Sequence, residues 1–429
     1  MKPLHSSAPR ASARRRMAGF TMAELMVTLV LFSVVVLGML MMFDMNSRIA
    51  RVEGHTAEMQ QSLRVAQQDL VRNVRMAARG GLPSALFPEG AYAGKELPLG
   101  LAVEVANNVP ANTQIAGKEP VLAGSDVMTI RGVFTTLYQS NPAGAGFTLE
   151  DTTGDGIPDR GELILSNVSP TGVPQDLRSV ADAIDATDNG PEPYLLVSPL
   201  DDGIFAVVEI DGDSEYNMSG SAITSVNLKF KTNNAYSAIT PGGKFPTAMT
   251  SVAYSGVLEE YRYYIRDQRT GTAQEGLEPR LSRARLYPGT DIPYLGEDEN
   301  LREDIADNIF DLQVALGVDT NGDESVTEGT DTASRKADEW LFNEVGDDAA
   351  TKATWNGTAA TPRRLYYVRL TTMARTDRRD PQPRWQAPAL SQFEDKDFTQ
   401  SPYNAFNSTT ERKFRRQFLQ TVVDLRNLS

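Results

Sequence analysis

An uncharged apolar run from residue 25 to residue 43 is the first clear pattern in the chain. Its 19 residues would span about 28 Å as a helix, close to the thickness of the hydrocarbon core of a bilayer. Beyond this run, apolar positions recur at spacings of three and four, which is typical of an amphipathic helix. The positions of this stripe are Ile49, Val52, Thr56, Met59, Leu63, Ala66, Leu70, Val74 and Ala77.

The two patterns together predict one continuous helix. No proline occurs between residues 20 and 82, whereas Gly80, Gly81 and Pro83 provide a helix stop. We therefore expect a helix over residues 20–80. Within it, 20–43 is the transmembrane or filament-core part and 44–80 is the amphipathic part, which packs against the rest of the protein.

Strand-like runs alternate with Gly, Pro, Asn and Asp from about residue 84 onward. The predicted strands are 126–138, 162–168, 194–198, 204–210, 225–231, 257–265, 282–286, 312–318, 365–373 and 418–425. The spacing of Ile305, Ile309 and Leu312 predicts a short helix, and residues 170–193 and 377–410 have the composition of long loops. The predicted fold class is α+β: a long N-terminal helix, then a mostly antiparallel β-sheet head, residues 81–429, with long loops.

Basic residues precede the apolar run. The first 19 residues contain no acid, and their basic residues are Lys2, Arg10, Arg14, Arg15 and Arg16. By the positive-inside rule the arginines stay cytoplasmic and the chain after residue 43 is exported. A conventional signal peptide carries a small-residue cleavage site after its apolar run, but residues 39–43 read Met-Leu-Met-Met-Phe. A plain membrane anchor does not account for a glutamate beside its core, since a carboxylate there needs a partner.

The sequence Gly-Phe-Thr-Met-Ala-Glu at residues 19–24 resembles the cleavage site of the type IV pilin and pseudopilin family. The resemblance implies that residues 1–19 are a leader, that a prepilin peptidase cuts after Gly19, and that the new N-terminus at Phe20 is methylated. Glu24 is then the fifth mature residue. Its carboxylate can neutralise the ammonium group of Phe20 on a neighbouring subunit, because each charge alone is costly in apolar surroundings.

Three segments of the second half, residues 259–265, 311–319 and 415–427, are similar to PilW-type minor pilins. This resemblance implies a minor type IV pilin near the pilus tip, which primes pilus assembly and presents an adhesive head. The chain is longer than a typical PilW, so the head is expected to contain insertions. Two alternatives remain: a type II secretion pseudopilin, and a membrane-anchored calcium-dependent adhesin that does not enter a filament.

The resemblance also implies partners and a location. The expected partners are other minor and major pilins, the prepilin peptidase, an inner-membrane assembly platform and, before assembly, the lipid bilayer. The protein is expected to cross the inner membrane once, with a periplasmic head, and to reach the extracellular pilus after assembly.

Two acidic loops have the spacing of calcium-binding loops, in which oxygen ligands alternate along the chain around one ion. In the first loop the candidate ligands are Asp151, Thr153, Asp155, Asp159 and Glu162, with the backbone carbonyl of Ile157. In the second they are Asp319, Asn321, Asp323 and Ser325, although Glu324 stands where the turn glycine is usual. The simpler interpretation is a pair of solvated acidic loops. If Ca2+ binds, it would stabilise an exported head by mass action.

Composition narrows the function further. The chain has no cysteine, which excludes disulfides, thiolate zinc sites and cysteine nucleophiles. The formal net charge is −14, which argues against nucleic acid as the main partner, because phosphate binding needs a basic face. No P-loop, GxSxG or HExxH motif is present. We therefore expect a structural protein and not an enzyme.

Overall fold

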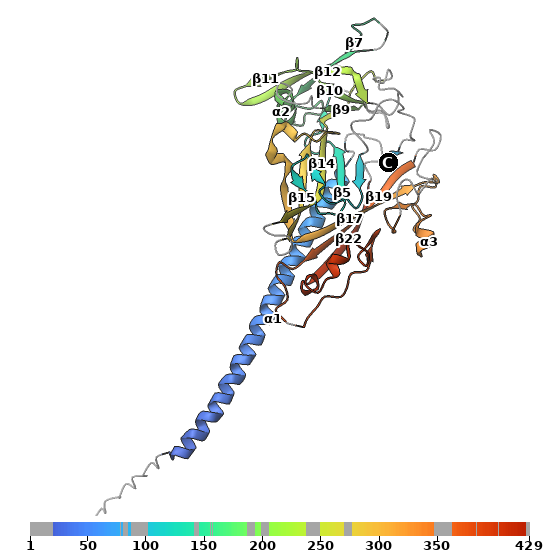
Figure 1. Cartoon of the computed structure of the whole chain (residues 1–429). Coiled ribbons are helices and arrows are strands. Elements are labelled where there is room, and N and C mark those ends of the chain that lie inside the picture. The colour runs from blue at the N-terminus through green and yellow to red at the C-terminus, as the bar shows by residue number, and fades with distance from the viewer. Residues whose placement is uncertain are drawn as a thin grey trace, which may run out of the picture. The chain divides into compact units, whose positions relative to one another are not determined.

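The structure is a computed structural model of the whole chain (Figure 1). It describes residues 20–77, 79, 85–86, 102–140, 146–154, 156, 158–186, 194–198, 206–236, 249–269, 277–346, 363–382, 384–401 and 403–425. The chain divides into two compact units, residues 1–54 and 55–429. Each unit is described below by itself.

The long helix α1 runs from Met22 to Met76, so the sequence predicted its existence and placed each end within four residues. In the first unit, none of the described residues 20–54 is buried. This part of α1 is long and apolar enough to cross a membrane by length and composition. Its exposed apolar surface is that of a segment whose partners are lipid or other chains.

The second part of α1 buries the predicted stripe in the head from Met59 onward, whereas Ile49 is 45% exposed. Met59, Leu63, Ala66, Leu70 and Val74 are all at most 4% exposed and belong to the largest core. The same core contains residues from two sheets, the central sheet and the C-terminal sheet defined below. The periodicity of three and four was therefore a correct signal of helix–sheet packing in this unit.

The central sheet has the strand order β16-β15-β14-β5-β2. Its strands are β16 (Glu303–Asp307), β15 (Leu277–Leu286), β14 (Glu259–Arg269), β5 (Val127–Gly132) and β2 (Val103–Ala106). The C-terminal sheet has the order β1-β19-β17-β18, with β22 also paired to β19. Its strands are β1 (Ala85–Leu86), β19 (Arg363–Arg375), β17 (Ile309–Asp319), β18 (Trp340–Leu341) and β22 (Arg416–Asp424).

A third sheet, the inserted sheet, has the order β6-β13-β9-β10-β12-β8-β7, with β11 on β12. Its strands are β6 (Tyr138–Gln139), β7 (Phe147–Glu150), β8 (Arg160–Ser166), β9 (Tyr194–Ser198), β10 (Ala206–Ile210), β11 (Glu215–Ser219), β12 (Ala222–Tyr236) and β13 (Tyr254–Val257). Helix α2 (Arg178–Ala186) packs into the same core as this sheet. The shorter elements are β3 (Gln114–Ile115), β4 (Glu119–Pro120), α3 (Thr332–Arg335), β20 (Gln392–Phe393), β21 (Lys396–Asp397) and the 3-10 turn η4 (Tyr403–Asn407).

The inserted sheet lies in the chain between two neighbouring strands of the central sheet. Strands β5 and β14 pair directly, with Gly132 opposite Glu259, yet all of β6 to β13 comes between them in sequence. The inserted sheet has a core of its own. An antiparallel pair needs only a two-residue turn, so residues 133–258 are an insertion into a simpler sheet. Every described strand pairing in these three sheets is antiparallel, which confirms the predicted fold class.

The short helix predicted around residues 305–312 was wrong. These residues belong to β16 and β17, which are separated at Asn308, where φ is 61°. Every residue of β17 is buried, so its apolar residues fall on both faces and imitate a helical spacing. A strand covered on both sides shows no clean alternation.

Two other predictions need correction. Residues 170–193 were expected to be a long loop, but they contain α2, whose Val180, Ala183 and Ile184 are buried. The helix is only nine residues long, so its periodic pattern is too short to separate from loop composition. The single strand predicted over 126–138 is divided into β5 and β6, because the chain leaves the central sheet and enters the inserted one.

Candidate functional site

The mature N-terminus predicted from the sequence begins at Phe20, and the structure describes the chain from this residue. Gly19 lies outside the described residues. Thr21 and Glu24 form a reciprocal pair: the Thr21 N–H donates to Glu24 Oε2 at 2.9 Å, and the Glu24 N–H donates to Thr21 Oγ1 at 3.3 Å. This is a capping box, which satisfies two donors that the first helical turn would otherwise leave free.

The capping box gives Glu24 a partner within its own chain. The Thr21 hydroxyl also donates to Glu24 Oε2 at 3.0 Å. Sequence reasoning treated Glu24 only as a partner for another subunit and overlooked Thr21, although Thr-x-x-Glu is the sequence signature of this cap. To neutralise a neighbour's ammonium group, the carboxylate would have to share or exchange these hydrogen bonds.

The hydroxyl groups within the apolar part of α1 are satisfied by the helix itself. Ser33 Oγ donates to the Leu29 carbonyl at 2.7 Å, and Thr28 Oγ1 donates to the Glu24 carbonyl. Such bonds to the preceding turn remove the cost of carrying a hydroxyl into hydrocarbon. The polar side chains of this segment are therefore compatible with a membrane.

The first acidic loop connects β7 and β8, and its first aspartate organises the turn. Asp151 Oδ1 accepts the Gly154 N–H at 2.6 Å, and its Oδ2 accepts the Gly156 N–H at 2.7 Å. Asp159 closes the loop, because it accepts the Thr152 N–H at 3.0 Å and the Thr152 hydroxyl at 2.5 Å. The Thr152 hydroxyl and N–H lower the pKa of Asp159.

The other predicted ligands of this loop are only partly described. Asp155 and Ile157 lie outside the described residues. Thr153 donates its hydroxyl to Asp151, and Glu162 lies in β8, where it accepts a hydrogen bond from Asn227.

The second acidic loop follows β17 and repeats this arrangement. Asp319 Oδ1 accepts the Gly322 N–H at 2.6 Å, and its Oδ2 accepts the Glu324 N–H at 2.9 Å. Thr320 donates its N–H and its hydroxyl to Glu339 Oε1 at 3.0 and 2.9 Å. Glu339 was not among the residues predicted from the sequence, because it lies beyond the expected length of such a loop.

The remaining predicted ligands of the second loop bond to one another. Asn321 Oδ1 accepts the Asp323 N–H at 2.8 Å, and Asp323 Oδ1 accepts the N–H and the hydroxyl of Ser325 at 2.9 and 2.7 Å. Glu324 has a φ of 62°, a left-handed conformation that costs a residue with a Cβ more than it costs glycine. The sequence had marked this position as the place of the usual turn glycine.

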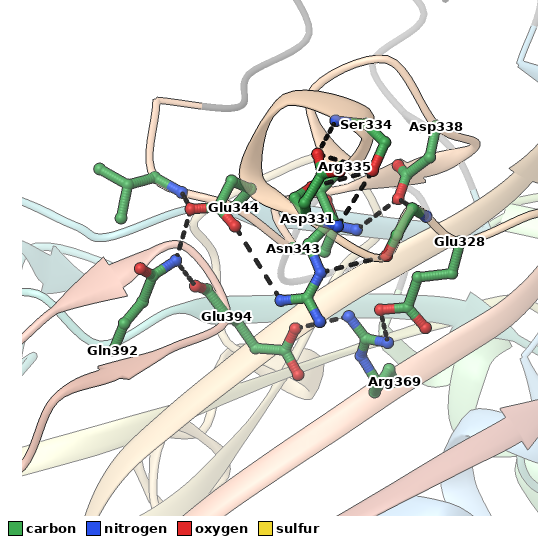
Figure 2. A network of polar contacts seen from close by, with 12 residues as sticks. Glu328, Asp331, Ser334, Arg335, Asp338, Asn343, Glu344, Arg369, Gln392 and Glu394 are labelled. Carbon is green, nitrogen blue, oxygen red and sulfur yellow. Dashed lines mark hydrogen bonds and ion pairs between the residues drawn. The ribbon is translucent and has the colours of Figure 1, made fainter.

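A polar network holds the second loop to the C-terminal sheet (Figure 2). The Arg369 guanidinium lies 2.8 Å from Glu328 and 2.7 Å from Glu394. Its Cζ atom also lies over the ring of Trp340, 4.4 Å from the ring centre. Arg369 is 9% exposed at its side chain and Glu394 only 3%. Breaking the Arg369–Glu394 pair is costly because it leaves one buried charge unpaired. The loop itself is attached through Glu328, whose side chain is 37% exposed.

The far side of the same network joins the loop to the hairpin β20–β21. Glu344 accepts a hydrogen bond from Gln392 at 2.8 Å, and Asp338 accepts one from Asn343 at 2.9 Å (Figure 2). A cavity of about 300 Å³ lies beside these residues, with Asp331 and Arg335 on its wall. Across the described parts of both loops, no three Asp, Glu, His or Cys side chains converge in a metal-binding arrangement.

The comparisons with known families match both ends of the chain. Residues 14–40 match the family described as the prokaryotic N-terminal methylation motif. Residues 262–427 match the family described as Type IV Pilus-assembly protein W. This second segment begins within β14 and includes β17, β18, β19 and β22 of the C-terminal sheet, whereas β1 and the insertion 133–258 lie outside it.

Comparison with whole proteins adds little. No curated protein matches the chain. Among solved structures, a type IV-like pilin from Thermus thermophilus is 11% identical, with 59% of this chain and 95% of that chain covered and a TM-score of 0.19, which is too low to support an argument. The methylation motif lies on the long apolar-to-amphipathic helix, and residues 262–427, the W-type segment, lie in the head. By these two matches the chain is similar to the type IV pilin superfamily, and most similar to PilW-type minor pilins.

Proposed function

We propose that this minor type IV pilin is incorporated near the pilus tip, where it primes assembly with other minor and major pilins. The observation that supports this proposal is the combination of one apolar helical segment with a head enlarged by a complete extra sheet. Helical spines of this kind pack closely in a shaft, and a bulky head is more easily accommodated at an end. The W-type segment favours a pilus over a type II secretion system.

The insertion 133–258 is the part of the head best suited to present an adhesive surface. It has its own core, so changes on its surface need not disturb the core that surrounds α1. Loops and inserted modules on a stable scaffold are where binding functions concentrate. The role of the head is accordingly structural and adhesive, without enzyme activity.

The proposed route begins in the inner membrane. The chain crosses it once through residues 20–43, with the head in the periplasm. The prepilin peptidase cleaves after Gly19, and the assembly platform then transfers the chain from the lipid bilayer into the extracellular pilus. Recovery of the protein from cells followed by N-terminal sequencing tests this route: a start at methylated Phe20 supports it, and a start at Met1 contradicts it.

Substitution of Glu24 separates capping from assembly. A glutamine at position 24 can still complete a capping box, but it cannot neutralise an ammonium group. If charge pairing drives incorporation, Glu24→Gln reduces the amount of protein in sheared pili at least tenfold, as Glu24→Ala does. The control is Thr21→Val, which weakens the cap and leaves the charge, and should retain incorporation.

An opposite result would assign Glu24 a purely local role. If Glu24→Gln enters pili normally while Thr21→Val and Glu24→Ala do not, helix capping and not charge pairing is the requirement. If the natural chain is itself absent from sheared pili and all three variants function normally, a membrane-anchored protein outside any filament becomes the better description.

We also propose that the two acidic loops bind Ca2+. The support is their shared geometry, in which Asp151 and Asp319 each bind the backbone N–H groups three and five residues later. The loops are thereby wrapped before any ion arrives, which lowers the entropy cost of binding. Calcium should raise the melting temperature of the full chain in detergent, and a double variant with Asp151→Ala and Asp319→Ala should abolish the shift. An equal shift with magnesium, or none with calcium, would contradict the proposal.

A further inference from the structure

A lysine and an aspartate form a completely buried ion pair beneath the hairpin β20–β21. Lys396 Nζ lies 2.8 Å from Asp311 Oδ2, and the two side chains are 1% and 0% exposed. Lys396 belongs to β21, whereas Asp311 lies near the start of β17 in the C-terminal sheet. The contact thus joins two segments that are 85 residues apart in the chain.

Aromatic rings enclose the amino group. The ring centres of Tyr403, Phe398 and Phe406 lie 4.9, 5.0 and 5.6 Å from Lys396 Nζ. Phe398 is fully buried and shares a core with Phe310, the residue before Asp311. Such a wall keeps bulk water away from the pair. In surroundings of low polarity, an ammonium and a carboxylate lose much of the solvation that keeps them charged.

The carboxyl group of Asp311 is held in position for reaction. Gln313 Nε2 donates to its Oδ1 at 3.1 Å, while Oδ2 faces Lys396. Burial raises the pKa of Asp311, even though Lys396 and Gln313 both act to lower it. The 2.8 Å contact is a direct path for a proton from Nζ to Oδ2, and this transfer would leave a neutral amine beside a neutral acid. The Gln313 amide polarises the C=O bond that an amine would attack.

We propose that Lys396 and Asp311 condense to an intramolecular isopeptide bond. The lone pair of Nζ attacks Cγ of Asp311, and a bond forms between nitrogen and carbon. The bond from Cγ to the protonated oxygen breaks, and this oxygen leaves with a proton from nitrogen as water. No oxidant or other reactant is needed. The fold supplies the two groups in contact, which replaces a bimolecular encounter by an intramolecular one.

Such a bond would reinforce the head where no disulfide can. The chain has no cysteine. The described residues between β19 and β22 form only short elements, β20, β21 and η4 among them. An amide from Lys396 to β17 would fasten this segment to a strand whose residues are all buried. It would also prevent β17 and the segment from separating under force, which hydrogen bonds alone resist less well.

Peptide mapping of the full chain, purified from membranes in detergent, tests the proposal. Trypsin should yield residues 303–335 joined to residues 385–412 as one branched species that is uncut at Lys396. Its mass should lie one water, about 18 Da, below the sum of the two peptides. The variant Lys396→Met should lose the branched species completely and migrate more slowly in a denaturing gel.

Lys396→Met leaves Asp311 buried without its partner and can fail to fold, so a double variant provides a second test. Lys396→Met with Asp311→Leu removes both charges together, and replacing a buried pair by apolar residues is often tolerated. It should fold, lack the branched species and unfold at a lower temperature than the natural chain. The exposed pair Lys118–Asp298 is the internal control and should give no branched species.

The outcome that overturns the proposal is equally clear. If the folded natural chain releases residues 303–335 and 385–396 as separate peptides in full yield, Lys396 and Asp311 form an ion pair only.

Discussion

At the scale of single residues, the head is notable for carboxyl groups buried beside β17. Asp126 is completely buried and accepts the N–H groups of Asn108 and Val314 at 2.8 and 2.7 Å. Burial, and then the charge of Asp395, raise its pKa well above the ordinary value. Each such group is tolerated because nearby donors replace part of the lost hydration.

Asp395 gives the protein a predicted pH dependence. Burial raises the pKa of Asp395 to about 7. Hydrogen bonds from Asn107 and Asn108 act to lower this pKa, whereas the nearby Glu394 acts to raise it. The folded chain therefore keeps a proton that the unfolded chain loses near pH 4, so stability falls as the pH rises from about 4 to about 7. Asp395→Asn should remove this loss. At pH values above 7 it should raise the free energy of unfolding by up to about 4 kcal/mol.

Thermal melts of the full chain at pH 5 and pH 8 check this prediction. The control is Asp397→Asn. The Thr399 hydroxyl and N–H lower the pKa of Asp397, so this group is ionised at both pH values and its substitution should change stability equally at pH 5 and pH 8. If Asp395→Asn is no more stabilising at pH 8 than at pH 5, Asp395 is ionised at both pH values.

At the scale of elements, α1 combines two environments in one helix. Its first part exposes apolar side chains, and its second part is held by the core and by polar contacts of Gln67, Asp69 and Asn73. Gln67 is 5% exposed and donates to Thr372 Oγ1 and the Leu419 carbonyl, both at 2.9 Å. This side chain ties the helix to β19 and β22, which fixes where along the sheet the helix lies.

Leu70 tests how strongly the core holds the second part of α1. Its side chain is completely buried in the largest core. Leu70→Ala should lower the free energy of unfolding by about 2–5 kcal/mol, because it removes apolar contacts and leaves a cavity. Gln68→Ala on the exposed side of the same helix should change it by less than about 0.5 kcal/mol. Chemical denaturation of both variants measures the difference, and equal losses would show that the helix is not anchored by this stripe.

At the scale of the whole molecule, the head consists of a core around α1 and an insertion with a core of its own. Two tyrosines that follow β15, Tyr287 and Tyr294, belong to the core of the insertion. Their ring centres are 5.3 Å apart, and Cζ of Arg285 lies over the Tyr294 ring, 3.9 Å from its centre. The W-type segment thus contributes residues that support the insertion.

Removal of the insertion tests the independence of the two cores. Because Gly132 and Glu259 are paired, residues 133–258 can be replaced by Asn-Gly, which forms a two-residue hairpin turn. With Tyr287→Thr and Tyr294→Thr to avoid exposed rings, this variant should fold and enter pili but lose adhesion. Pilus incorporation and binding of cells to a surface are the two measurements. A chain that fails to fold would show that the cores are interdependent.

The N-terminal helix and the processing motif could be predicted from the sequence because their signals are local. A run of apolar residues, a spacing of three and four, and a glycine before Phe-Thr-Met-Ala-Glu depend on neighbours a few positions away. The strand at 194–198 was predicted with its exact bounds, since its own residues are mostly apolar and turn residues flank it on both sides. Where a strand is buried on both faces, as at β17, the same local signal was misleading.

The sequence by itself determined that this protein has a membrane-length apolar helix with a prepilin-type start, followed by an antiparallel α+β head. Only the tertiary structure decided that the head contains an inserted sheet with its own core, and that Lys396 meets Asp311. The reason is physical. Helix and strand formation follow from short-range periodicity, whereas a buried charge pair or a second core depends on which distant segments exclude water together.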